Sequence, residues 1–196
     1  DRLFASIGLR STWESILSRA AMSTRALKEA RHSGTRIVQI VGTPRSGTTL
    51  LSMIVDTHPK ALCLVEPYLA WLQNGEFEYN WDEINLPISN PGHDRPHKLL
   101  SRLCREGDWD VVAFKETFRT AWHPTFPTQE FLEENADYDA VDQSLAIVRD
   151  PRDTWSSVIR RHPRFEGNTQ VLCELVHAWN QLCSWIEKTG VSYVRY

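Results

Sequence analysis

Residues able to bind an anion lie together between Gly42 and Thr49, in the stretch Gly-Thr-Pro-Arg-Ser-Gly-Thr-Thr. The backbone N–H groups of a glycine-bounded loop can converge on a phosphate or sulfate, and a helix that begins directly after the loop adds partial positive charge. Arg45 supplies a planar guanidinium that can hold two anion oxygens without a metal ion. These residues predict an anion-binding loop, and a tight strand-to-helix turn with no ligand is the simpler alternative.

The loop departs from the motif that binds ATP. In that motif a lysine follows the second glycine and reaches the terminal phosphates, and a serine or threonine after it holds magnesium. Gly42 and Gly47 have the required spacing, but Thr48 stands where the lysine belongs, and the cation lies inside the loop as Arg45. We therefore expect no metal in the site, and an atypical P-loop kinase or NTPase is the weaker catalytic interpretation.

The flanking residues predict the elements that position this loop. The β-branched run at 37–41 predicts a buried strand, and the apolar spacing that follows predicts a helix from about 48 to 57, ended by Pro59. Further strands are expected at 61–65, 110–114, 144–148 and 191–196, and further helices at 96–106, 151–161 and 172–186. This alternation predicts an α/β fold of the P-loop type, with a mainly parallel sheet flanked by helices in three layers.

Three polar residues are expected near one edge of that sheet. Glu66, Lys115 and Arg149 each follow one of the predicted strands, and ligands bind at the carboxyl ends of strands in open α/β sheets. The topology therefore predicts that these three side chains lie near Arg45.

Two segments resemble sulfotransferases that use 3′-phosphoadenylyl sulfate (PAPS). The run Gly-Thr-Pro-Arg-Ser-Gly-Thr-Thr-Leu-Leu at 42–51 resembles the family's 5′-phosphosulfate loop, and residues 145–160 resemble its 3′-phosphate segment. The resemblance covers 36–196 and implies a PAPS-dependent sulfotransferase. It implies that the donor is held by Arg45, Ser46, Gly47, Thr48, Thr49, Arg149 and Ser157.

The resemblance also implies how the site would work. The transition state of sulfuryl transfer is highly charged, so catalysis requires positioning, neutralisation of the leaving phosphate and removal of the acceptor's proton. Arg45 and Lys115 would provide the positive charge, with Lys115 matching the family's lysine after the third strand. A surface lysine is the simpler alternative for Lys115, and a salt-bridged corner with Asp150 is the simpler alternative for Arg149.

The general base separates two branches of the family. Cytosolic members have a histidine two residues after the lysine, but this chain reads Lys115-Glu116-Thr117. Carbohydrate and several bacterial members use a glutamate after the second strand, and Glu66 matches that position, so the chain resembles this type more closely. Glu66 is the expected base, with Glu116 and His123 as alternatives. A structural salt bridge between Glu66 and Lys115 is the simpler interpretation.

The whole chain limits the function classes. The amphipathic pattern at 2–33 predicts a helical arm at 1–34, and the resemblance implies a sulfotransferase-like domain at 35–196 that is incomplete at its C-terminus. The net charge of −3 gives no general attraction to nucleic acid. No signal peptide or apolar run of membrane-spanning length is present, which favours a cytoplasmic protein. The four cysteines lack metal or redox spacing and are expected to be buried free thiols.

The expected partners are the nucleotide donor and an acceptor. The acceptor would carry a hydroxyl or an amine, as a carbohydrate or another small molecule does. The polar segment at 71–96, rich in tryptophan, asparagine and proline, is a candidate lid or substrate loop. A non-catalytic, nucleotide-binding remnant of the fold is the remaining interpretation.

Overall fold

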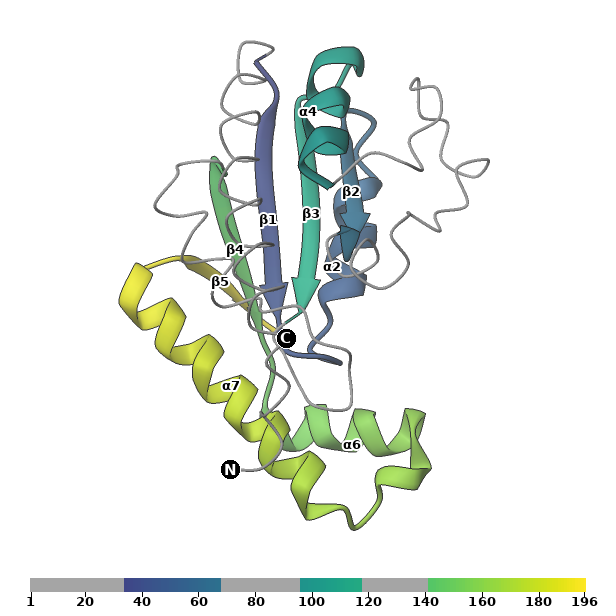
Figure 1. The fold of residues 1–196 in the computed structure, drawn as a ribbon, viewed down its shortest axis with the longest axis vertical. Coiled ribbons are helices and arrows are strands. Elements are labelled where there is room, and N and C mark those ends of the chain that lie inside the picture. Colours follow the sequence, from purple (N-terminus) through teal and green to yellow (C-terminus); the bar gives the residue numbers. More distant parts are fainter. Residues whose placement is uncertain (1–33, 68–95, 118–140) are drawn as a thin grey trace, which may run out of the picture.

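Five parallel strands form the sheet of this protein, in the order β2-β3-β1-β4-β5 (Figure 1). The computed structural model describes residues 34–67, 96–117 and 141–196. Its strands are β1 (Arg36–Gly42), β2 (Ala61–Val65), β3 (Val111–Thr117), β4 (Gln143–Val148) and β5 (Ser192–Arg195). Because β1 pairs with both β3 and β4, the loop that follows it leaves from the middle of the sheet. The predicted α/β class is confirmed.

Helices lie on both faces of the sheet. They are α2 (Thr48–Asp56), α4 (Pro96–Glu106), α6 (Pro151–Arg161) and α7 (Thr169–Thr189), and a short 3-10 turn, η3 (Pro163–Phe165), follows α6. Three predicted features lie outside the described residues: the arm at 1–34 except for Gly34, the 71–96 segment except for its last residue, and His123.

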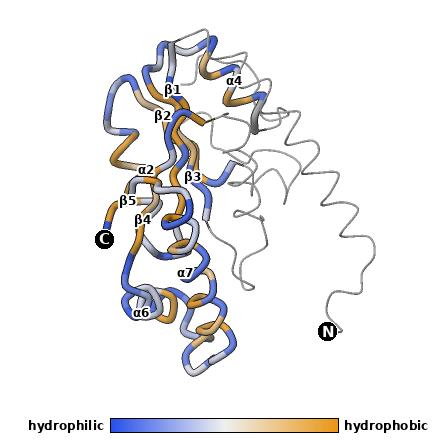
Figure 2. The backbone as a smooth tube through the Cα atoms, turned by 90° about the vertical axis from the view of Figure 1, so that its left-hand side faces the viewer, coloured by the Kyte–Doolittle hydropathy of each residue, from blue (hydrophilic) through white to orange (hydrophobic). Residues whose placement is uncertain are grey.

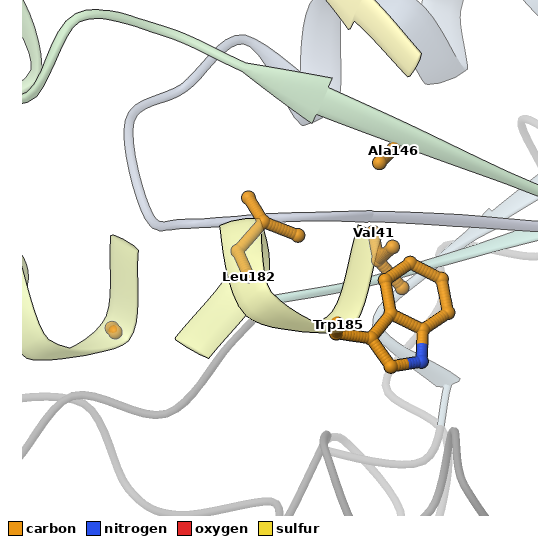
Figure 3. Packing of buried hydrophobic residues seen from close by; sticks show 5 residues of the cluster. Val41, Ala146, Leu182 and Trp185 are labelled. Atoms are coloured by element: carbon orange, nitrogen blue, oxygen red, sulfur yellow. The ribbon is translucent and has the colours of Figure 1, made fainter. Parts of the chain in front are cut away.

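Neighbouring residues of β1 pack on opposite faces, as the pleat of a strand requires. Val41 joins Ala146 in a core cluster completed by Ala178, Leu182 and Trp185 of α7 (Figure 3). Ile40 instead joins a cluster on the other face, against which α2 packs. The strands consist mainly of apolar residues, whereas the connecting segments are more hydrophilic (Figure 2). These two cores hold β1 between layers of helix.

The third strand is longer than predicted. The pattern at 110–114 places Lys115 and Thr117 after the strand, but β3 continues through both residues. Parallel pairing with β1 extends to Gly42 opposite Thr117, and this pairing outweighs the weak strand preference of charged residues. The side chains of Lys115 and Thr117 therefore share one face of the sheet, and Glu116 faces the other.

Replacing Gly42 with alanine is expected to lower the free energy of unfolding by about 3 kcal/mol, measured by urea denaturation. An added Cβ would lie 2.6 Å from Ser46 Oγ, 2.7 Å from Ile147 Cγ2 and 2.7 Å from Thr48 Cγ2. Gly167→Ala is the control, because its Cβ would meet nothing within 4 Å and only its φ of +75° is unfavourable, at about 1 kcal/mol. Equal losses in the two variants would contradict the close packing of the loop.

The cysteines are all free, but only two are buried. Burial raises the pKa of the Cys63 and Cys104 thiols to about 12, whereas Cys173 is exposed, contrary to the sequence-based expectation. A thiolate is the reactive species, so at about pH 8 a maleimide should label Cys173 quickly and Cys63 and Cys104 only after unfolding. Mass spectrometry of labelled peptides would test this order, and fast labelling of Cys63 in the folded protein would contradict it.

Candidate active site

A cavity of about 320 Å³ lies where the loop after β1 meets the ends of β2, β3 and α6. It is lined by Pro44, Arg45, Thr48, Thr49, Glu66, Lys115, Thr117, Arg161 and His162. The cavity thus joins the predicted anion loop to the predicted base and lysine. Its cationic side chains and threonine hydroxyls are of the types that bind phosphate and sulfate oxygens.

Arg161 and His162 line this cavity, although no sequence argument selected them. Arg161 is the last residue of α6, and His162 is the residue that directly follows this helix. Arg161 lies four residues after Ser157, so the two share a helix face, and this spacing was the available signal. Arg161 adds a second guanidinium to the same space as Arg45.

The loop itself is built from residues in left-handed backbone conformations. Arg45 has a φ of 65° and Gly47 a φ of 103°. The Ser46 hydroxyl is buried and donates to the Thr43 carbonyl at 2.7 Å, as does the Ser46 backbone N–H at 3.2 Å. Neither Ser46 nor Gly47 lines the cavity. Their role in this structure is to shape the loop that presents Arg45, Thr48 and Thr49.

Arg45 links the two predicted anion segments. Its Nε lies 3.3 Å from Ser157 Oγ, and Arg149 Nη1 donates to the Arg45 carbonyl at 3.2 Å. Trp179 of α7 donates its indole N–H to the Arg149 carbonyl at 3.0 Å, and the Arg149 guanidinium lies 5.0 Å from the centroid of the Tyr196 ring. Arg149 and Ser157 do not line the cavity themselves. They are tied to it through Arg45, across more than a hundred residues of sequence.

A salt-bridged corner does form after β4, but Arg149 is outside it. Asp150 accepts from the backbone N–H, Nε and Nη2 of Arg152, at 2.8, 3.0 and 2.6 Å. The Arg152 side-chain hydrogen bond is the main reason that the pKa of Asp150 is lowered to about 2. Because Asp150 is paired with Arg152 rather than with Arg149, the Arg149 guanidinium remains directed at the loop.

Glu66 and Lys115 form an ion pair inside the cavity. Lys115 Nζ lies 2.7 Å from Glu66 Oε1, and Thr117 Oγ1 donates to the same oxygen at 3.0 Å. The Lys115 side chain is only 4% exposed and that of Glu66 is 22% exposed. The Glu66 backbone N–H also donates to the Lys115 carbonyl at 2.7 Å. The salt bridge foreseen as the simpler interpretation is therefore present, and it lies within the candidate site.

The other two candidate bases are not placed in the cavity. Glu116 is fully buried in β3, faces away from Lys115 and does not line the cavity, so the structure does not support it as the base. His123 lies outside the described residues.

Within ranges 34–67, 96–117 and 141–196, no helix is both long and apolar enough to cross a bilayer. In the same ranges, no three histidine, cysteine, aspartate or glutamate side chains are grouped so that they could hold a metal ion.

Comparison with known proteins identifies a distant relative of this chain. No family model matches the chain. A Caenorhabditis briggsae protein described as "Putative protein-tyrosine sulfotransferase" is 24% identical over an alignment of 165 residues. The alignment covers 74% of this chain and 51% of the relative, so the chain spans about half the length of that protein. This similarity, at low identity, supports an enzyme of the sulfotransferase kind and sulfuryl transfer as the general class of reaction.

Proposed function

We propose that this chain forms the donor-binding and catalytic part of a PAPS-dependent sulfotransferase, with Glu66 as the general base. One observation carries the proposal: the loop guanidinium of Arg45 and the Glu66–Lys115 pair line the same cavity. Anion binding and proton removal are the two tasks that sulfuryl transfer to a hydroxyl requires, and here their residue types share one space.

The donor would be held from the loop outward. Arg45, Thr48 and Thr49 face the cavity and would bind the 5′-phosphosulfate, with Arg161 adding positive charge from α6. Arg149 and Ser157 contact Arg45 from the side of β4 and α6 and would bind the 3′-phosphate. When bound, PAPS supplies an electrophilic sulfuryl group joined to a phosphate leaving group.

The charged side chains in the cavity indicate what the protein would contribute to the reaction. Glu66 would take the proton from the acceptor hydroxyl or amine as the new bond to sulfur forms and the bond from sulfur to the phosphate oxygen breaks. The released product is adenosine 3′,5′-bisphosphate, whose developing negative charge Lys115 and Arg45 would stabilise. Lys115 is almost completely buried, and a charge in such surroundings acts more strongly than one in water.

Transfer of labelled sulfate from PAPS tests this function. The acceptor panel should contain carbohydrates, small phenols and amines, and also tyrosine peptides, because the relative's name points to protein tyrosine. We expect transfer to at least one acceptor class, with inhibition by adenosine 3′,5′-bisphosphate and no need for magnesium. Magnesium-dependent ATP turnover, with neither sulfate transfer nor affinity for the bisphosphate, would favour the kinase or NTPase interpretation instead.

A further inference from the structure

We infer that Thr117 is a positioning residue for the Glu66 carboxylate, an inference that rests on the proposed function. Lys115 and Thr117 are two apart in β3, so both side chains face Glu66 from one side of the sheet. Both donate to the same carboxylate oxygen, Oε1, at 2.7 and 3.0 Å. Across the described part of the chain, these two donors leave Oε2 without a hydrogen bond, so it is the oxygen able to accept a proton.

Thr117 contributes something that Lys115 cannot. A lysine ammonium on a flexible stem can pair with either oxygen of a carboxylate, or with both. A threonine side chain is stiff about its first torsion, and Thr117 is held by strand pairing opposite Gly42. Its hydroxyl therefore keeps Oε1 occupied as a hydrogen-bond acceptor, leaves Oε2 for the incoming proton and fixes the plane of the carboxylate.

The backbone of Glu66 is anchored to the same strand. Its N–H donates to the Lys115 carbonyl at 2.7 Å, and its φ of 50° is uncommon for a residue other than glycine. Such a conformation persists when the surroundings determine it. Main chain and carboxylate of Glu66 are thus both held by Lys115 and Thr117 of β3, at the cavity that all three residues line.

Thr117→Val removes the hydroxyl while keeping the shape and the strand preference, and Thr117→Ser keeps the hydroxyl. With PAPS and the best acceptor, we expect Thr117→Val to lower kcat by roughly 10- to 100-fold, because Lys115 can then occupy both oxygens and the base loses its alignment. The acceptor KM and the affinity for adenosine 3′,5′-bisphosphate should stay within about twofold of wild type. Thr117→Ser should recover most of kcat.

The results of these experiments distinguish the inference about Thr117 from the proposed function. Wild-type transfer with an unchanged kcat in Thr117→Val, or equal losses in the valine and serine variants, would overturn the inference and leave the proposed function standing. An absence of transfer by the wild type would overturn both. In the Glu66→Gln background, adding Thr117→Val should lower kcat by less than twofold, because the two residues act together. A full additional loss there would assign Thr117 to a separate role and overturn the inference.

Discussion

Arg45→Ala is expected to lower kcat/KM for sulfuryl transfer by roughly 30- to 1,000-fold, equivalent to about 2–4 kcal/mol of transition-state stabilisation. The Arg45 guanidinium lines the cavity, and its contacts with Ser157 and Arg149 join the two anion segments. Its removal should therefore weaken the neutralisation of the leaving phosphate and loosen the link between the segments. Steady-state kinetics with varied PAPS measures this loss.

Lysine at position 45 and a neighbouring arginine serve as controls for that variant. Arg45→Lys keeps the charge and the left-handed backbone position but loses the two-pronged geometry, so we expect an intermediate loss. Arg152→Ala removes an arginine whose side chain is 89% exposed and paired with Asp150, and it should leave the rate within about twofold. Equal effects at positions 45 and 152 would show that Arg45 contributes only general charge.

Glu66→Gln should lower kcat by roughly 10²- to 10⁴-fold, the usual contribution of a positioned general base. Glutamine keeps the shape and can still accept from Lys115 and Thr117, but it cannot take a proton from the acceptor. Affinity for adenosine 3′,5′-bisphosphate should remain within about threefold of wild type, because the anion loop is untouched. Kinetics and calorimetry on the same preparation separate these two effects.

Glu66→Gln also removes a negative charge, and a control must separate the effect of this charge loss from the loss of the base. It leaves the buried Lys115 ammonium without its partner, so some loss of the free energy of unfolding is expected. Glu106→Gln removes the exposed partner of Arg102 on α4 and should change neither kcat nor affinity. A Glu66→Gln protein that is folded, binds the bisphosphate and keeps the wild-type kcat would rule out Glu66 as the base.

Local sequence patterns were sufficient for most of the described fold. Short apolar runs predicted each strand. Gly190 follows the last residue of α7 in a left-handed conformation, the usual role of glycine at the end of a helix. The start of α7 was placed three residues late, because Asn168 caps it by accepting from the Val171 N–H. A polar first turn carries no apolar periodicity, so only the capping residue could have marked that start.

The candidate site was less predictable, because it depends on contacts between distant segments. The carboxyl ends of parallel strands could be grouped from topology alone, and Glu66, Lys115 and Arg45 do share one cavity. The approach of Arg161 from the far end of α6 depends on how that helix crosses the sheet edge, which no local pattern encodes. The Thr117 hydrogen bond depends on the extension of β3, which is decided by pairing with β1 rather than by residue preference.

Calorimetric titration with adenosine 3′,5′-bisphosphate tests the central claim most directly. The wild type should bind the bisphosphate saturably without magnesium. The double variant Arg45→Met/Arg149→Met should lose affinity by about 100-fold or more, because each arginine contributes at least one charge-assisted contact. Arg152→Met/Arg160→Met, which alters two exposed arginines of α6, should bind as the wild type does. Tight binding that survives the loss of both Arg45 and Arg149 would contradict the account.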